Sequence, residues 1–66
     1  MAKTYRYYTL YRPPMLGAVP SGFCEVVYFD ERRYCPQVGR EAWGYVEYKQ
    51  PLSPQEIVNY ELASMQ

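Results

Sequence analysis

The alternation of side chains in the first half of the chain predicts two β-strands separated by a long loop. Residues 4–12, TYRYYTLYR, are rich in tyrosine and threonine and stop at Pro13-Pro14, which cannot continue a central strand. Residues 13–22 carry three prolines and two glycines and predict a loop longer than a tight hairpin needs. Residues 23–29, FCEVVYF, alternate with period two again and predict the second strand.

The second half begins with a charged connection and a third strand. The run DERR at residues 30–33 and the residues that follow it predict a connection, with at most a short edge strand at 33–35. Residues 41–49, EAWGYVEYK, predict the third strand. Its Gly44 has no side chain, so an aromatic ring or a ligand can lie against the backbone there.

A helix over residues 54–63 has the clearest local signature in the chain. Ser53 is the expected N-cap, Pro54 follows at the first helical position, and Glu56 comes three residues after the cap. The hydroxyl and the carboxylate can therefore satisfy free amides of the first turn reciprocally. The apolar side chains of this helix are Ile57, on which Leu52 can pack, and the stripe Val58, Leu62 and Met65.

Together these elements predict a single α+β domain over residues 1–66, a small antiparallel sheet of three to four strands with one C-terminal helix packed on a face. Period two puts Tyr5, Tyr7 and Tyr11 on one side of the first strand. The other side has Arg6, Tyr8, Leu10 and Arg12. The pattern does not decide which side the helix covers. The uncovered side is a binding surface, a dimer interface, or a surface covered by the long loop.

Chain length and composition favour a small folded domain in the cytoplasm. A chain of 66 residues has a thin core, and oligomerisation is a common remedy, so we expect a homo-oligomer. Aromatic residues make up 18% of the chain, which excludes the profile of intrinsic disorder. The two cysteines are expected to be reduced, and no signal peptide, membrane span or membrane partner is predicted.

The formal net charge is zero, but the charges are unevenly distributed. Residues 1–24 contain three basic side chains and no acidic one, whereas residues 25–66 contain four basic and seven acidic side chains. A basic N-terminal strand and loop could form a local anion site. The alternative, which we favour slightly, is that the two halves pair with each other.

The residue types argue against an enzyme. There is no histidine, which is the usual general base near neutral pH and the commonest metal ligand. Two cysteines eleven residues apart do not form a zinc site, and no glycine-rich phosphate loop is present, so we expect neither a metal nor a cofactor. A hydrolase that uses Glu25 and Glu47 is conceivable, but strand carboxylates are more often solvated or paired with arginine.

The interleaving of tyrosine and arginine instead favours binding. Tyrosine offers a flat apolar face and arginine a planar fork for phosphate, which suits a nucleotide or a short nucleic acid; the same residues dominate protein interfaces. Packing is the alternative for many of these tyrosines, a core position is favoured for Trp43, and Glu41 is a possible partner for Arg40. The candidate ligand-binding residues are Arg6, Tyr8, Tyr11, Arg12, Arg40, Trp43 and Tyr45.

Three stretches, YTLYRPPMLGAVPSG at 8–22, GREAWGYVEY at 39–48 and PLSPQEI at 51–57, resemble short proteins carried by phages and conjugative elements of gut Firmicutes. The resemblance implies that the chain antagonises host defence. We therefore expect a non-catalytic binding protein that sequesters a nucleotide signal or binds nucleic acid. The alternatives are an inhibitor that docks on a host defence protein through its aromatic face or proline-rich loop, and an accessory module of a larger assembly.

Overall fold

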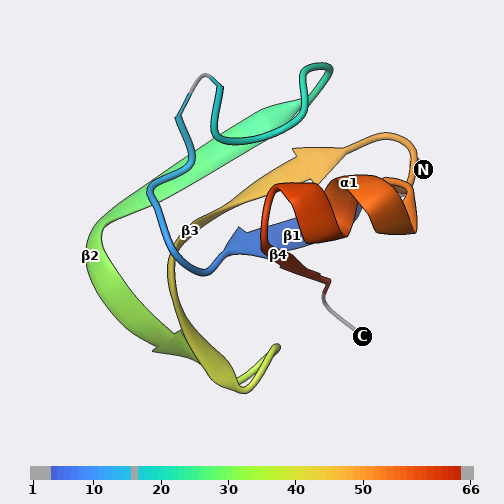
Figure 1. Cartoon of the computed structure of the whole chain (residues 1–66). Helices are drawn as coiled ribbons and strands as arrows, with labels where there is room; N and C mark the ends of the chain where they lie inside the picture. Colours follow the sequence, from blue (N-terminus) through green and yellow to red (C-terminus); the bar gives the residue numbers. More distant parts are fainter. Residues whose placement is uncertain (1–3, 16, 65–66) are drawn as a thin grey trace.

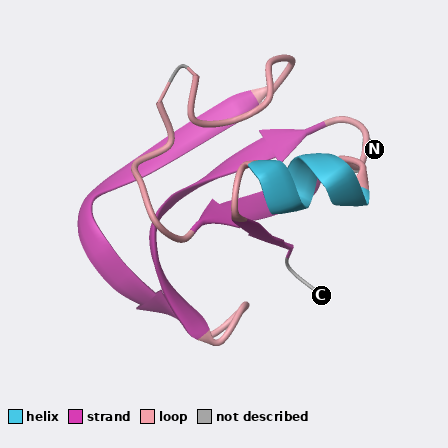
Figure 2. Cartoon of the chain, viewed as in Figure 1, coloured by secondary structure: helices cyan, strands magenta, loops and turns pink. Residues whose placement is uncertain are grey.

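The computed structural model describes residues 4–15 and 17–64, which form a four-stranded antiparallel sheet and one short helix (Figure 1). The elements are β1 (Tyr5–Thr9), β2 (Glu25–Cys35), β3 (Arg40–Tyr48), α1 (Pro54–Asn59) and β4 (Leu62–Ser64). The strands lie in the order β2-β3-β1-β4, so β2 and β4 are the edges. The predicted α+β class, with a C-terminal helix on one face of a small sheet, is confirmed (Figure 2).

Two strands differ in extent from their predictions. β1 ends at Thr9 rather than at residue 12, because the chain already bends into the loop that Pro13 continues. β2 begins at Glu25 rather than at residue 23 and continues through the charged run to Cys35. Its ladder with β3 breaks after Tyr28 and resumes at Arg33, so the charged run is a bulge inside one long strand rather than a connection.

The helix is shorter than predicted and ends at Asn59. Glu61 has a left-handed backbone, with φ of 54°, which stops the helix and redirects the chain. Leu62 then pairs with Thr9 as the first residue of β4, so it belongs to a strand and not to a helical stripe. Val58 is exposed, and Met65, the last residue of the predicted stripe, lies outside the described residues.

The start of the helix has the predicted capping box. The Glu56 backbone N–H donates to the Ser53 hydroxyl over 3.2 Å, and the Ser53 backbone N–H donates to the Glu56 carboxylate over 3.1 Å. Leu52 and Ile57, on either side of the cap, both pack against the buried cluster under the helix. The local sequence therefore determines where the helix begins and how it enters the core.

Replacing Ser53 by Ala should lower the free energy of unfolding by about 1 kcal/mol, because the Glu56 amide loses its side-chain acceptor. Urea denaturation followed by circular dichroism measures this loss. Ser21→Ala, an exposed loop serine, is the control and should change the free energy of unfolding by less than about 0.5 kcal/mol. Equal effects of the two substitutions would show that the cap does not stabilise the fold.

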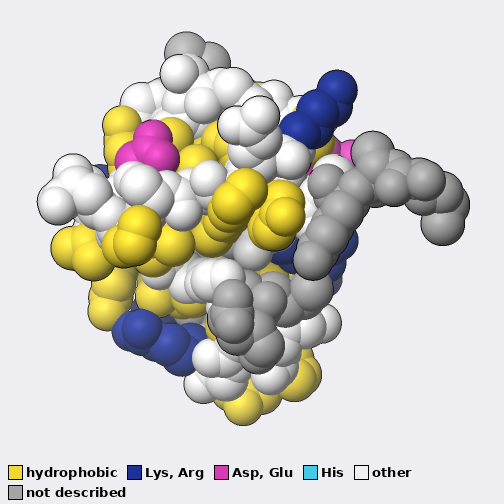
Figure 3. All heavy atoms as spheres, turned by 90° about the vertical axis from the view of Figure 1, so that its right-hand side faces the viewer, with side chains coloured by type: hydrophobic (Ala, Val, Ile, Leu, Met, Phe, Trp, Pro, Cys, Tyr) yellow, Lys and Arg dark blue, Asp and Glu magenta, His cyan; other side chains and the backbone are white. Residues whose placement is uncertain are grey.

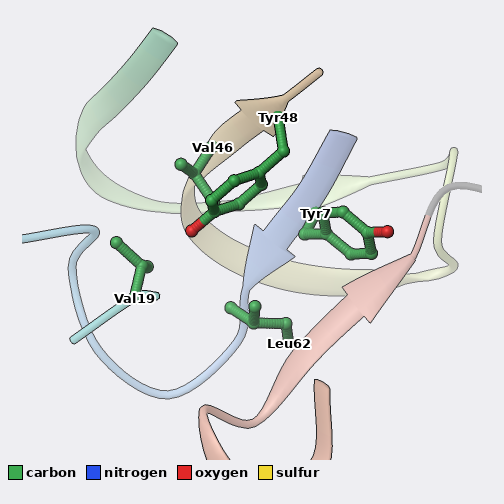
Figure 4. Close-up of a cluster of buried hydrophobic side chains, with 5 residues drawn as sticks. All are labelled: Tyr7, Val19, Val46, Tyr48 and Leu62. Carbon is green, nitrogen blue, oxygen red and sulfur yellow. The ribbon is translucent and has the colours of Figure 1, made fainter. Parts of the chain in front are cut away.

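The helix and the long loop cover the same face of the sheet, the face with Tyr5 and Tyr7. Figure 4 shows the buried cluster on this face, Tyr7, Val19, Val46, Tyr48 and Leu62. The rings of Tyr7 and Tyr48 meet edge to face with centroids 5.9 Å apart, and the Leu52 N–H donates to the Tyr7 hydroxyl over 2.9 Å. Val19 comes from the loop, so residues 13–22 form part of the core cover.

The loop is held at two further points. The Pro14 ring lies against Gly44 of β3, which explains the missing side chain there: its neighbour is a proline, not an aromatic ring or a ligand. The buried Tyr48 hydroxyl donates to the Pro20 carbonyl over 2.5 Å. The loop therefore covers the same face as the helix, and the hypothesis that it covers the opposite face is wrong.

The opposite face has its own buried cluster, built largely from the β2–β3 hairpin. Tyr8, Leu10, Cys35 and Ala42 are its buried members. Phe29, Val38, Tyr45 and Ala63 pack against them. Figure 1 shows the long hairpin curving away from the short strands. The turn of this hairpin closes at Gly39, whose φ is 68° and whose N–H donates to the Cys35 carbonyl over 2.8 Å.

Candidate functional site

A bulge in β2 shapes the surface on the side opposite the helix. Tyr28 pairs with Gly44 and Arg33 pairs with Ala42, so residues 29–32 stand opposite the single residue Trp43. Asp30 in the bulge has a left-handed backbone, with φ of 67°, which aspartate tolerates better than most residues. Bulges of this kind re-aim side chains and are common next to functional sites.

The bulge helps to form a shallow hollow of about 250 Å³, which we call the arginine–aromatic hollow. Its lining is Arg6, Tyr8, Phe29, Arg33, Tyr34, Cys35, Pro36, Gln37 and Tyr45. The Tyr45 ring lies at its centre, with centroid distances of 5.6 Å to the Tyr8 ring and 6.0 Å to the Phe29 ring. The Arg6 guanidinium lies 4.0 Å from the Tyr45 centroid, and that of Arg33 lies 5.4 Å from the Phe29 centroid.

Within this hollow, the Arg6 side chain already has partners in the chain, both for its charge and for its flat face. Its guanidinium donates to the Glu47 carboxylate over 2.8 Å and forms an ion pair of 2.6 Å with it. Contacts with the Tyr8 hydroxyl and with Glu47 raise the pKa of Arg6, so it stays charged. Arg6 therefore covers a face of Tyr45 and is itself neutralised. Tyr8 is only 2% exposed and offers no free ring face, whereas Tyr34 at the rim is 64% exposed.

The other candidate residues lie apart from this hollow. Arg12 pairs with Glu61 at the end of the helix. Arg40 donates to the Tyr11 hydroxyl over 2.8 Å and stacks over the same ring at 5.7 Å. Of the seven candidates, the structure brings Arg6, Tyr8 and Tyr45 together and pairs Tyr11 with Arg40. It does not unite Arg12 and Arg40 in a common cleft.

Trp43 is half-buried and belongs to neither buried cluster. It is therefore not the central core residue that the sequence favoured. It stands opposite the β2 bulge, where no ladder partner packs beside it.

Most arginine charges are compensated within the chain. Four of the five arginines have carboxylate partners: Arg6 with Glu47, Arg12 with Glu61, Arg32 with Glu41 at 3.7 Å, and Arg33 with Glu31 at 3.8 Å. The first two pairs join the basic N-terminal part to the acidic remainder, so the alternative that the halves pair with each other is confirmed. Little net positive charge is left to attract an anion.

The two thiols are free, as expected, and their settings differ. Cys24 is exposed, whereas Cys35 is buried, and burial raises the pKa of the Cys35 thiol. In residues 4–15 and 17–64, no three histidine, cysteine, aspartate or glutamate side chains gather where they could hold a metal ion. Within the same residues, no helix is long and apolar enough to cross a membrane.

A second surface lies on the first part of β2, and the sequence did not single it out. Phe23, just before the strand, is 37% exposed, and Val26 and Tyr28 are 38% and 47% exposed; we call these three residues the β2 patch. Val26 and Tyr28 stand opposite Val46 and Gly44 on the helix face, and the Phe23 ring meets the Tyr48 ring edge to face at 6.5 Å. The β2 patch is therefore continuous with the buried cluster on the helix face, but the helix and the loop leave it partly exposed.

Exposure alone does not distinguish the β2 patch. In the view of Figure 3, hydrophobic side chains also reach the surface in several separate groups between polar ones. Tyr11, Met15, Tyr34 and Val58 are further large apolar side chains exposed elsewhere. What sets the β2 patch apart is its continuity with the core and its place on an edge strand.

Comparison with known families identifies the chain. A family model described as Defence against restriction A C-terminal matches residues 2–66. The chain belongs to this family. The Defence against restriction A C-terminal family agrees with the predicted anti-defence protein of a phage or another mobile element. The gut Firmicutes setting stays a prediction. No curated protein and no solved structure matches the chain.

Several residues of both surfaces are not predictable from the sequence pattern. Phe29, Arg33 and Tyr34 line the hollow, although the DERR run looked like a solvated connection. An aspartate able to adopt a left-handed backbone inside an otherwise strand-like run was the one available signal of a bulge. The exposure of Val26 and Tyr28 depends on which strand lies at the edge, and no local pattern indicates strand order.

Proposed function

We propose that this member of the Defence against restriction A C-terminal family opposes restriction by binding, without catalysis, to a protein component of the restriction system. The contact surface is the β2 patch, Phe23, Val26 and Tyr28. A protein that opposes restriction has two targets within reach, the DNA that is cut and the enzyme that cuts it. The distribution of charge and apolar surface favours the enzyme.

Compensated charge supports this choice over DNA. Binding to DNA draws its affinity from lysine and arginine side chains that neutralise several phosphates. Here the formal net charge is zero and four of five arginines face a carboxylate of the same chain. A phosphate that bound one of these arginines would also lie close to the carboxylate paired with it, and the two negative charges would repel each other.

The observation that carries the proposal is the exposed apolar edge of the core. Protein interfaces are enriched in aromatic residues and depleted in charge at their centres, and tyrosine is among the usual hot spots. Phe23 and Tyr28 are aromatic and Val26 is apolar, and Val26 and Phe23 lie beside the buried core residues Val46 and Tyr48. A partner that covers them gains apolar burial without having to order the surface first.

The test is inhibition of a panel of purified restriction endonucleases acting on unmodified DNA. The wild-type chain should slow cleavage by its target, and Tyr28→Ser should raise the concentration for half inhibition about tenfold, or about 1.4 kcal/mol. Tyr34→Ser is the matched control, because Tyr34 is also an exposed tyrosine of β2 but lies outside the patch. It should change inhibition by no more than about twofold.

Three outcomes would contradict the proposal. The first is that no enzyme of the panel is bound or inhibited. The second is that Tyr28→Ser and Tyr34→Ser act alike. The third is that protection follows binding of the chain to the DNA itself, measured by gel shift at the inhibiting concentrations.

A second candidate function is binding of a nucleotide at the arginine–aromatic hollow. It is favoured by one observation, the neighbouring exposed Arg33 and Tyr34 at the rim of that hollow. In the same assay, this candidate predicts that Arg33→Ala loses protection, whereas Arg32→Ala and Tyr28→Ser keep it.

The expected homo-oligomer stays a prediction, and sedimentation equilibrium of the free chain tests it.

A further inference from the structure

The outer edge of β2 is open next to the β2 patch. Glu25–Tyr28 pair with β3 on one side only, and within the described residues no strand lies on the other side. An edge strand presents unpaired backbone N–H and C=O groups to any extended segment that approaches it. Peptide recognition by strand addition uses such edges.

The two parts of this edge are protected to different degrees. In the second part, residues 29–32 leave the ladder and include three charged side chains, and the break and the charges both discourage strand pairing. The first part, Glu25–Tyr28, contains no proline, no lysine and no break in its ladder. The unprotected segment is therefore short and coincides with Val26 and Tyr28.

The charge of Glu25 indicates which side chain an added strand would place beside it. Glu25 stands directly opposite Glu47 in the ladder, and like charges in this position destabilise a sheet. Arg6 neutralises Glu47, but the Glu25 side chain is exposed and has no hydrogen bond or ion pair within the described residues. A lysine or arginine on a neighbouring outer strand would supply the missing positive charge.

We infer that the partner adds an extended segment to the outer edge of Glu25–Tyr28, with apolar side chains beside Val26 and Tyr28 and a basic side chain beside Glu25. This inference rests on the proposed protein target and specifies how that target is held. A second copy of the chain fits less well. Antiparallel pairing of two Glu25–Tyr28 segments puts no basic residue beside Glu25 in any register.

The experiment uses the isotope-labelled full chain and three capped seven-residue peptides. The first alternates valine and threonine and carries one arginine in place of a threonine. The second has glutamate at that position. The third keeps the arginine but is N-methylated at two consecutive central residues, which blocks backbone pairing on both of its edges. Amide chemical shifts report where each peptide binds and how tightly.

The arginine peptide should shift the amides of Glu25–Tyr28, and the other two peptides should bind at least about tenfold more weakly. Glu25→Lys should reverse the preference between the arginine and glutamate peptides. Glu31→Lys, a change at another exposed carboxylate of β2, is the control and should leave the preference unchanged.

The inference is overturned if no peptide binds, if the N-methylated peptide binds as tightly as its parent, or if the shifts lie elsewhere. It is also overturned if the same amides shift on concentrating the chain alone, because a second copy then occupies the edge. In each case, a selective effect of Tyr28→Ser on endonuclease inhibition would leave the proposed function standing. Failure of that effect would remove the proposed function itself.

Discussion

Gly44→Ala should unfold much of the protein at room temperature, with a loss of about 3 kcal/mol or more in the free energy of unfolding. A Cβ atom at this position would lie 2.2 Å from the Val27 carbonyl oxygen and 2.9 Å from the Pro14 ring. The first neighbour is backbone inside the β2–β3 ladder, so it cannot move aside without breaking that ladder. A domain of this size has little stability in reserve.

Urea denaturation and amide chemical-shift dispersion measure this effect, and two controls separate its causes. Gly39→Ala places a side chain in open space at a φ of 68°, so it should cost only about 1 to 2 kcal/mol of backbone strain. Adding Pro14→Ala to Gly44→Ala relieves the ring contact but not the carbonyl contact, and should not restore folding. A Gly44→Ala protein within about 1 kcal/mol of wild type would contradict this account.

Features that depend on neighbouring residues in sequence were predictable. The start of α1 follows from Ser53, Pro54 and Glu56, three residues within one turn, and all three act as expected. The end of α1 was not predictable, because nothing local shows that Glu61 turns left-handed and that Leu62 pairs with Thr9 of β1. That outcome depends on the tertiary sheet, because β3 pairs with one side of β1 only and leaves the other side for β4.

The candidate site shows the same division. Period two correctly grouped Arg6 with Tyr8 on one side of β1, and the ladder places Tyr45 opposite Tyr8. Arg12 and Arg40 were expected to serve a ligand, but they have partners within the chain that are remote in sequence, Glu61 and Tyr11. Whether a charged side chain is free for a ligand depends on long-range pairing, and a single sequence does not show it.

The contacts of the loop at residues 13–22 support a structural role for it. Its length and prolines suggested a functional loop or a docking element. In the structure, Pro14 and Val19 are buried, and the Pro20 carbonyl accepts a hydrogen bond from the core. The prolines stiffen a segment that lies on the sheet and contributes only an isolated β-bridge residue, Val19, so this structural role is sufficient to explain them.

Tyr48→Phe should lower the free energy of unfolding by about 2 kcal/mol at neutral pH, because it removes a buried hydrogen bond and leaves the Pro20 carbonyl without its donor. The ring and its contacts with Tyr7 and Phe23 are retained, so the change isolates the hydroxyl. Tyr34→Phe, at an exposed tyrosine, should change stability by less than about 0.5 kcal/mol.

The same substitution predicts a pH dependence. Burial, with smaller effects from Glu56, Tyr60 and Tyr7, raises the pKa of Tyr48 to about 12 from its ordinary value of 10.0. The unfolded chain thus releases this proton at a lower pH than the folded chain, so the stabilisation by Tyr48 is complete below pH 10 and is lost as the pH rises toward 12. The stability difference between wild type and Tyr48→Phe should therefore shrink between pH 10 and 12 in urea denaturation. A difference that stays constant over this range would show that the hydroxyl is not held protonated by its buried site.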